Sequence, residues 1–282
     1  MEHQRSILIT GCSSGIGLSC ALGLAQRGWQ VIASARQAAD VERLQAQGLQ
    51  AVQLDLNDPD SIAAGLQAAL ALTGQRLDAL FNNGAYGQPG AVEDLTRETL
   101  RAQFETNLFG WHDLTRRVIP LMRNQGQGRI LQNSSVLGFA ALPFRGAYVA
   151  SKFALEGLTD TLRLELRGSG IEVILIEPGP ILSRFRDNAY RAYQRHIDPS
   201  TSPYRETYQR MEERLRKEGA AQPFTLPPEA VLHKLLQALE SPHPKPRYYV
   251  TFPTHLIGAL HRLLPSRAMD WVLYQTSRGG RG

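Results

Sequence analysis

The segment Thr10-Gly11-Cys12-Ser13-Ser14-Gly15-Ile16-Gly17 decides the fold of this 282-residue chain. It directly follows the apolar run Ile7-Leu8-Ile9, a candidate buried strand, and it opens a helical pattern that reaches Arg27. Glycines permit a tight turn and let the backbone approach a phosphate closely. The free N–H groups of a helix N-terminus also attract an anion. The segment therefore predicts a dinucleotide-binding turn in a first strand–helix unit, against the alternative of a tight turn alone.

Short apolar runs alternate with longer helical patterns along the rest of the chain. Further strands are expected at residues 31–33, 51–54, 77–81, 129–132, 171–176 and 248–252. Helices are expected at 15–27, 40–47, after Asp58-Pro59, and at 96–122, 148–167 and 228–239. Such alternation implies right-handed crossovers and a parallel sheet covered on both faces. We therefore expect residues 1–282 to form one doubly wound, Rossmann-like α/β domain with a mostly parallel seven-stranded sheet.

The composition is that of an ordinary globular protein, with 43% hydrophobic and 20% charged residues. The net charge of +5 suits a phosphate-bearing cofactor as well as nucleic acid. No apolar run approaches the ~18 residues that a membrane span needs, and glycines and serines interrupt the N-terminal apolar stretch, which argues against a cleaved signal. We expect a cytoplasmic protein. Cys12 and Cys20 are too few for a disulfide framework, and we expect inert thiols and no metal site.

The glycine spacing resembles the T-G-x-x-x-G-x-G turn of the short-chain dehydrogenase/reductase family rather than G-x-G-x-x-G. Later motifs agree with that family in order and spacing, although the last two residues of its N-N-A-G motif are exchanged here. The resemblance covers about residues 6–183 and extends to the branch of hydroxysteroid, retinol and aliphatic aldehyde reductases. The motifs are Asn82-Asn83-Gly84-Ala85, Asn107 in a helix, Ser134-Ser135, Tyr148-Val149-Ala150-Ser151-Lys152 as Y-x-x-x-K, and Ile176-Glu177-Pro178-Gly179-Pro180-Ile181.

Tyr148 and Lys152 carry the chemistry that the residues themselves suggest. They lie four residues apart on a predicted helix and therefore share one face. An ammonium beside a phenol favours the phenolate, so we expect Lys152 to bring the pKa of Tyr148 down toward neutral pH, where proton transfer works best. The resemblance implies that Ser135 hydrogen-bonds the same substrate oxygen and that Asn107 holds a water linking Lys152 to solvent. The candidate catalytic residues are Asn107, Ser135, Tyr148 and Lys152.

The residues at the end of the second predicted strand indicate which cofactor the protein uses. An acidic residue there would bind the ribose of NAD, whereas Arg accommodates the 2′-phosphate of NADP. The chain offers Arg36 and no carboxylate before Asp40, which predicts NADP(H), against the alternative of a solvated arginine. The resemblance adds Asp55 and Leu56 at the adenine, Asn83 and Gly84 along the adenosine, and Ile181 and Ser183 at the nicotinamide. The remaining candidate cofactor residues are Gly11, Ser13, Ser14, Gly15, Ile16, Gly17, Tyr148, Lys152, Pro178 and Gly179.

Two C-terminal segments depart from the alternation. Residues 184–225 are rich in Arg and Tyr, as in some single-strand nucleic-acid binders, but interspersed glutamates are typical of a solvated helix. Because this stretch covers the substrate in the family, we favour a substrate lid and expect no nucleic acid. Residues 254–282 carry a leucine pattern interrupted at Pro265, which predicts a helical tail. The tail packs on the domain or a second subunit, or, less favoured, contacts a membrane surface.

These observations predict an NADP(H)-dependent oxidoreductase that interconverts an aldehyde or ketone and its alcohol by hydride transfer, with Tyr148 as general acid/base. One rival is an NADP(H)-sensing protein without turnover, whose mark would be a damaged catalytic set. Another is a membrane-peripheral retinoid, steroid or lipid reductase, which would differ only in the tail. We expect a small-molecule carbonyl or alcohol substrate and a homodimer or homotetramer.

Overall fold

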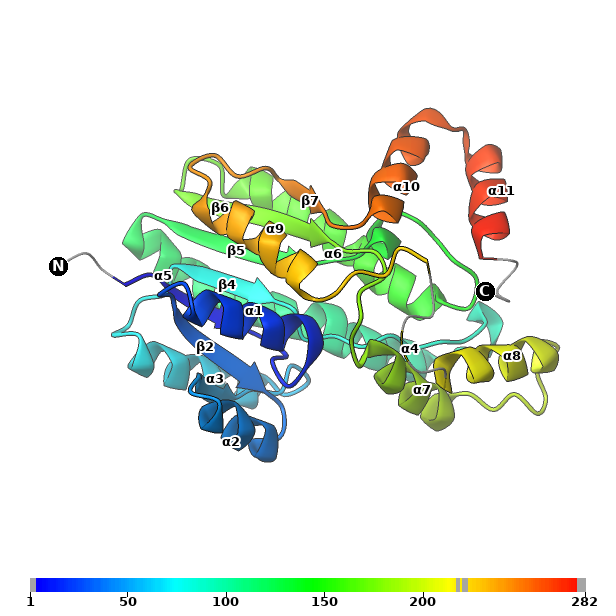
Figure 1. The fold of residues 1–282 in the computed structure, drawn as a ribbon, viewed down its shortest axis with the longest axis horizontal. Coiled ribbons are helices and arrows are strands. Elements are labelled where there is room, and N and C mark those ends of the chain that lie inside the picture. The colour runs from blue at the N-terminus through cyan, green and yellow to red at the C-terminus, as the bar shows by residue number, and fades with distance from the viewer. Residues whose placement is uncertain (1–3, 217–218, 220–222, 278–282) are drawn as a thin grey trace.

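The structure, a computed structural model, describes residues 4–216, 219 and 223–277, and its centre is a seven-stranded sheet (Figure 1). The strands stand in the order β3-β2-β1-β4-β5-β6-β7, and every neighbouring pair is parallel. The predicted doubly wound fold with a mostly parallel sheet is thereby confirmed. The strand order reverses between β1 and β4, which is where ligands bind in such sheets. The strands are β1 (Ser6–Ile9), β2 (Gln30–Ala35), β3 (Gln50–Gln53), β4 (Ala79–Asn82), β5 (Gly128–Asn133), β6 (Ile171–Glu177) and β7 (Arg247–Tyr249).

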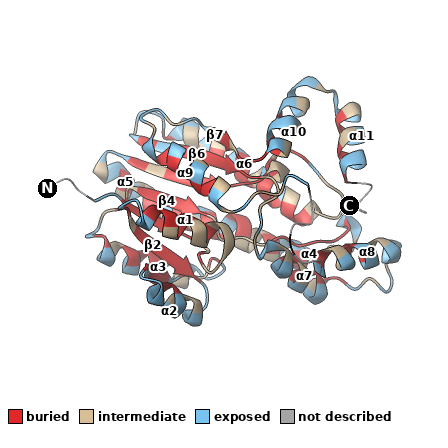
Figure 2. Ribbon diagram, in the orientation of Figure 1, coloured by how far each residue is buried: buried red, intermediate tan, exposed pale blue. Residues whose placement is uncertain are grey.

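Helices cover both faces of the sheet, and each face has its own apolar core (Figures 1 and 2). Because successive side chains of a strand point to opposite faces, Ile7 and Ile9 enter one core and Leu8 the other. The first core is closed by α1 (Gly15–Ala25), α2 (Ala38–Ala46) and α9 (Glu229–Glu240). The second is closed by α3 (Pro59–Leu72), α5 (Gly110–Gln125) and α6 (Gly146–Glu165).

The predicted helix at 96–122 is interrupted, which the sequence pattern did not indicate. It consists of α4 (Arg97–Phe104), a π-helical turn η2 (Glu105–Phe109), and α5, which runs on to Gln125. Asn107 lies in the π-helical turn and is fully buried. Single π turns inside helices are frequent at functional sites, so the interruption itself marks Asn107. Two short 3-10 turns complete the elements near the cavity, η1 (Val92–Asp94) and η3 (Val136–Gly138).

The predicted lid at 184–225 contains two helices, α7 (Phe185–His196) and α8 (Arg205–Arg216), at the end of the molecule toward which the strands point (Figure 1). The rings of Tyr193 and Tyr208 stack with centroids 5.7 Å apart. The Tyr208 hydroxyl accepts from the N–H of Ala91 at 2.9 Å and donates to Asp94 Oδ2 at 2.6 Å. The lid is therefore anchored to the segment before α4. Residues 217–218 and 220–222 of the predicted lid lie outside the described residues.

The tail forms α10 (Phe252–Leu263) and α11 (Ser266–Thr276), separated at Pro265 as predicted. The expected strand at 248–252 is shorter, because α10 already begins at Phe252 with Pro253 in its first turn. Met269 and Leu273 are buried against Ala140, so the tail packs on its own domain. None of the described helices is both long enough and apolar enough to cross a membrane. Residues 278–282 of the predicted tail lie outside the described part of the chain.

Candidate active site

The glycine turn is held against the end of β4 by close backbone contacts. Gly11 has a φ of +71°, and a Cβ added to it would lie 2.5 Å from the Cα of Gly84. A Cβ on Gly17 would lie 2.3 Å from the carbonyl oxygen of Gly11. Only glycine fits at these two positions, because the obstructing atoms are backbone. Beneath the turn the thiols are buried; burial raises the pKa of Cys12 to about 12 and that of Cys20 well above its usual value, in line with inert thiols.

A cavity of about 390 Å³ lies at the carboxyl ends of the central strands. Fourteen of the predicted site residues line it, from the glycine turn, the ends of β4 to β6, and α6. Five do not: Gly17 and Leu56 support the turn from behind, Asn107 lies deeper, and Arg36 and Asp55 stand farther along the sheet edge. The lining residues among those predicted are Gly11, Ser13, Ser14, Gly15, Ile16, Asn83, Gly84, Ser135, Tyr148, Lys152, Pro178, Gly179, Ile181 and Ser183.

A chain of hydrogen bonds connects the glycine turn with Lys152. Thr10 Oγ1 accepts from the backbone N–H of Asn83 at 2.8 Å. Asn133 Nδ2 donates to Asn83 Oδ1 at 2.8 Å, and Lys152 Nζ donates to the carbonyl oxygen of Asn133 at 2.8 Å. Sequence reasoning missed Thr10 and Asn133 as supports of the site. The sequence did hold a signal for Asn133. It directly follows the strand expected at 129–132 and precedes Ser134-Ser135, and the carboxyl ends of parallel strands meet at the edge of the sheet where the site lies.

Tyr148 and Lys152 lie together in the protein interior on α6. The exposed fraction of Lys152 is 1%, and its Nζ lies 4.2 Å from the ring centroid of Trp111 and 5.8 Å from that of Tyr148. Trp111 Nε1 donates to the carbonyl oxygen of Gly84 at 2.7 Å. The Trp111 ring therefore packs against Lys152 Nζ and is held in place by its hydrogen bond to Gly84. Sequence reasoning missed Trp111, although it follows Asn107 by one helical turn.

The expected downward shift of the Tyr148 pKa is wrong for the protein alone. Burial raises the pKa of Tyr148 to about 12, and the hydrogen bond with Ser135 opposes this only in part. Burial likewise lowers the pKa of Lys152 to about 7, against the opposing effect of Glu156. The physical reason is that a dry interior disfavours both the phenolate and the ammonium. At neutral pH the site therefore holds a neutral phenol, which is a proton donor.

Asn107 and Ser135 are placed by backbone contacts. Asn107 Nδ2 donates to the carbonyl oxygen of Tyr86 at 2.9 Å, and its Oδ1 accepts from the Tyr86 N–H at 3.2 Å. Asn107 Nδ2 also lies 3.4 Å from Ser151 Oγ on α6. Ser135 Oγ accepts from the N–H of Leu137 at 3.1 Å, and its hydroxyl also hydrogen-bonds Tyr148, so the two hydroxyls lie side by side at the cavity. The water that the resemblance assigns to Asn107 stays a prediction.

Three predicted cofactor residues lie beyond the cavity, near the ends of β2 and β3. Arg36 directly follows β2, is exposed, and has no hydrogen bond or ion pair through its guanidinium within the described residues. The Asp55 carboxylate accepts from the N–H of Asn57 at 3.0 Å and so shapes its own turn. Leu56 packs against Gly84, whose added Cβ would lie 3.0 Å from Leu56 Cδ1. Their contacts with a cofactor stay predictions.

The predicted lid contributes to the cavity lining beside Tyr148. The ring centroids of Phe185 and Tyr148 are 5.3 Å apart, with the rings edge to face. Leu142, Leu182 and Leu215 add apolar surface to the lining. The charged lining residues are all cations, and no described Asp or Glu lines the cavity. They are Arg145, Lys152, Arg184, Arg186 and Arg214.

The residues present fit a dinucleotide with its negatively charged phosphates. The first turn of α1 lines the cavity, its N-cap Ser14 makes no side-chain hydrogen bond, and no acidic residue stands in that turn. Helix N–H groups left without a cap attract an anion. The tight glycine backbone lets such a group approach closely, and the cationic lining adds to the attraction.

A nucleotide turn beside a buried Ser–Tyr–Lys group, at the reversal point of a parallel sheet, is the arrangement of an oxidoreductase that uses a nicotinamide nucleotide. Comparison with known families agrees, because the model described as "short chain dehydrogenase" matches residues 5–194. The chain belongs to that family. The predicted family resemblance is thereby confirmed.

Individual relatives point the same way. The chain is 45% identical over 270 residues to the uncharacterized oxidoreductase YbbO of Escherichia coli, covering 96% of this chain and 94% of that one. It is 33% identical over 260 residues to human 17-beta-hydroxysteroid dehydrogenase type 1, covering 87% and 77%. A short chain dehydrogenase/reductase from Burkholderia phymatum, solved in complex with NAD, matches with a TM-score of 0.76 at 25% identity, covering 93% and 94%. A nicotinamide cofactor is supported for this fold.

Proposed function

We propose that the protein is an NADP(H)-dependent oxidoreductase that interconverts an aldehyde or ketone and the corresponding alcohol. The observation that carries the proposal is that Ser135, Tyr148 and Lys152 line one cavity together with the glycine turn. The relation to a hydroxysteroid dehydrogenase adds support for a carbonyl or secondary alcohol as the reacting group. The all-cationic charged lining supports a phosphate-rich cofactor.

In the reducing direction, bound NADPH supplies hydride to the carbonyl carbon. Tyr148 donates its proton to the carbonyl oxygen, and its raised pKa keeps that proton in place at neutral pH. The Ser135 hydroxyl donates a hydrogen bond to the same oxygen and stabilises the charge that develops there. Lys152 holds a proton near Tyr148, and Asn107 positions the 86–87 backbone against α6.

The preference for NADP(H) over NAD(H) rests on Arg36. Its guanidinium follows β2, where the ribose of a dinucleotide lies in doubly wound folds, and it is free of described partners. A 2′-phosphate would give this exposed cation a charge-assisted hydrogen bond. The Burkholderia relative in complex with NAD shows that the fold also accepts the cofactor without that phosphate. The residue at this position is therefore the proposed determinant.

The experiment that tests the function is a panel of aldehydes, ketones and steroids, assayed with NADPH and with NADH. We expect cofactor oxidation with at least one carbonyl compound and a higher kcat/KM with NADPH. Absence of turnover on the whole panel, together with tight NADPH binding, would favour the rival of a sensing protein. The intact set of Asn107, Ser135, Tyr148 and Lys152 argues against that rival, because a protein without turnover has no need of a proton donor.

The remaining expectations concern assembly and location. A homodimer or homotetramer, tested by sedimentation, and a cytoplasmic location stay predictions. The tail packs on its own domain, yet Leu263, Trp271 and Tyr274 are exposed on it. A membrane-peripheral retinoid, steroid or lipid reductase would show binding of the full chain to lipid vesicles. We expect no such binding, because the buried face of the tail is already used within the domain.

A further inference from the structure

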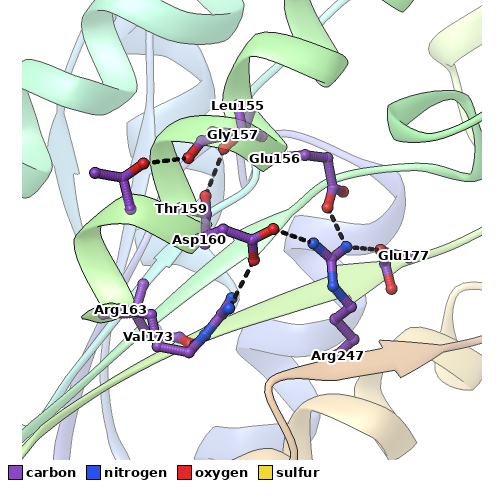
Figure 3. Close-up of polar contacts among 10 residues, drawn as sticks. Leu155, Glu156, Gly157, Thr159, Asp160, Arg163, Val173, Glu177 and Arg247 are labelled. Atoms are coloured by element: carbon purple, nitrogen blue, oxygen red, sulfur yellow. Dashed lines mark hydrogen bonds and ion pairs between the residues drawn. The ribbon is translucent and has the colours of Figure 1, made fainter. Parts of the chain in front are cut away.

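Beyond Lys152 along α6 lies a cluster of charged side chains from α6, β6 and β7, which surround Arg247 (Figure 3). Nη1 of Arg247 donates to Oε1 of Glu177 at 2.6 Å and also to Oε2 of Glu156. Nη2 of Arg247 donates to Oδ2 of Asp160 at 2.6 Å. The side chains of Glu156 and Glu177 are 8% and 0% exposed. Two carboxyls from different elements therefore share one guanidinium nitrogen inside the protein.

The cluster holds more acidic than basic groups. Within the described residues, Arg247 is the only cation that hydrogen-bonds Glu156 or Glu177, whereas Asp160 has a second partner in Arg163 at 2.6 Å. Two like charges in contact in a dry interior cannot both form easily, so such a pair keeps a proton. Burial raises the pKa of Glu156, and burial with the charge of Glu156 raises the pKa of Glu177 to about 8. At neutral pH the pair accordingly retains a proton.

The pair is electrically connected to the catalytic lysine. Tyr148, Lys152, Glu156 and Asp160 follow each other at intervals of four residues, so they lie along one face of α6. Lys152 and Glu156 are both buried, and little solvent screens the attraction between them. Burial lowers the pKa of Lys152 to about 7, and the negative charge of Glu156 opposes that shift. The charge on Lys152 thus depends on whether Glu156 is ionised.

Ser134 lies between the cluster and the cavity. A Cβ added to Gly138 would lie 2.6 Å from Ser134 Oγ and 2.7 Å from Glu156 Oε1, so both oxygens pack closely against Gly138. The Ser134 hydroxyl lowers the pKa of Glu156, against the effect of burial. Ser134 also lines the cavity. Through Ser134 the cluster is therefore in contact with the cavity lining.

One further titratable group faces the pair, Tyr249 on β7. Burial and the charge of Glu177 raise the pKa of Tyr249, and Arg262 of α10 opposes the shift. A phenol with a raised pKa is neutral throughout the physiological range, so Tyr249 adds no charge there. The balance of charge near Lys152 is therefore set by Glu156, Glu177 and Arg247, together with Asp160, whose negative charge also raises the pKa of Glu156.

We propose that Glu156 and Glu177 share one proton and thereby set the charge on Lys152, which makes both carboxyls positioning residues for proton transfer at Tyr148. The inference rests on the proposed function, because the charge of Lys152 matters for catalysis only where Tyr148 exchanges protons. Removing Glu156 takes away the negative charge that stabilises the Lys152 ammonium, so the pKa of Lys152 falls. Removing Glu177 relieves the repulsion on Glu156, which then ionises fully and stabilises the ammonium. The two substitutions act in opposite directions.

Trp111 offers a direct readout, because its ring lies 4.2 Å from Lys152 Nζ. The indole resonance of Trp111 is followed against pH in protein labelled with 15N-tryptophan, and it is assigned by its loss in Trp111→Phe. We expect a midpoint near the Lys152 pKa of about 7 in the unaltered protein and no titration in Lys152→Met. We expect Glu156→Gln to lower the midpoint by about one pH unit, a tenfold change in the ionisation constant. We expect Glu177→Gln to raise it by a smaller amount.

Matched variants separate this role from a structural one. Glu165→Gln makes the same change at an exposed position of α6 and should leave the midpoint unchanged. Glu156→Asp keeps the negative charge, so its midpoint should lie close to that of the unaltered protein. This variant tests the proposal even if Glu156→Gln is too unstable to purify. Three results would overturn the proposal. Glu156→Asp could lower the midpoint as far as Glu156→Gln, or neither variant of Glu156 could move it. The third is that Glu177→Gln lowers the midpoint. Because the signal needs no substrate, it stands or falls independently of turnover.

Discussion

The glycine turn and the lid lie at the same cavity but are held in different ways. At the turn, backbone meets backbone: an added Cβ on Gly17 or Gly11 would come within 2.3 Å or 2.5 Å of main-chain atoms. The lid is held by side chains, above all by the buried ring and hydroxyl of Tyr208. Backbone contacts tolerate no change of residue, whereas side-chain contacts can be exchanged. The first region therefore carries a recognisable motif, whereas the second does not.

Of the substitutions at the turn, at Arg36 and in the lid, Gly17→Ala should have the largest effect. The new methyl group would meet the carbonyl oxygen of Gly11, so the turn has to shift and its backbone can no longer approach a phosphate as closely. We expect NADPH affinity to fall about 100-fold, or ~2.7 kcal/mol, measured by fluorescence titration. Gly157→Ala is the control, because nothing lies within 4 Å of its Cβ on α6. Near-normal affinity in Gly17→Ala would show that the turn is not held by backbone crowding.

Arg36→Ala should have an intermediate effect. The exposed guanidinium has no described partner to lose, so the fold should be unaffected while an interaction with the 2′-phosphate disappears. We expect the preference for NADPH over NADH, measured as a ratio of kcat/KM values, to fall about tenfold, or ~1.4 kcal/mol. Arg123→Ala, an exposed position near the end of α5, should leave the ratio unchanged. An unaltered ratio in Arg36→Ala would remove Arg36 as the determinant.

Tyr208→Phe should have the smallest effect on activity. It leaves the N–H of Ala91 without its acceptor and removes one hydrogen bond to the Asp94 carboxylate, to which Ser202 still donates, and this costs about 1–3 kcal/mol of stability. Since the lid rather than the turn is loosened, we expect KM for the carbonyl substrate to rise about fivefold with NADPH affinity unchanged. Tyr274→Phe, on the exposed side of the tail, serves as the control. A loss of NADPH affinity in Tyr208→Phe would mean that the two regions are not independent.

The same contrast explains what the sequence could predict. The parallel sheet, the glycine turn and the Tyr148–Lys152 pair were predictable, because alternating apolar runs and a four-residue spacing have few structural solutions. The π-helical turn at Asn107 was not, since it depends on tertiary contacts with Tyr86 rather than on a local pattern.

The pKa of Tyr148 was predicted in the wrong direction for a related reason. Spacing along α6 indicated that Lys152 is near, but only the structure reveals how deeply both side chains are buried and that Lys152 Nζ bonds the carbonyl oxygen of Asn133. Burial is a property of the assembled core, and a pattern in one helix does not report it. The sequence indicated a solvated helix at Glu206 to Glu213, which lies within α8, but not the face that α7 and α8 bury, since its apolar partners come from the distant segment at 91–95.

The central claim is that the phenol of Tyr148 delivers the proton to a carbonyl oxygen in this cavity. The most direct test compares NADPH oxidation by the unaltered protein and by Tyr148→Phe, on the best carbonyl substrate of the panel, after equal NADPH affinity has been established for both. Loss of a general acid should lower kcat by at least ~100-fold, because the variant keeps the ring and loses only the hydroxyl group that donates the proton. Equal kcat values for the two proteins would contradict the account.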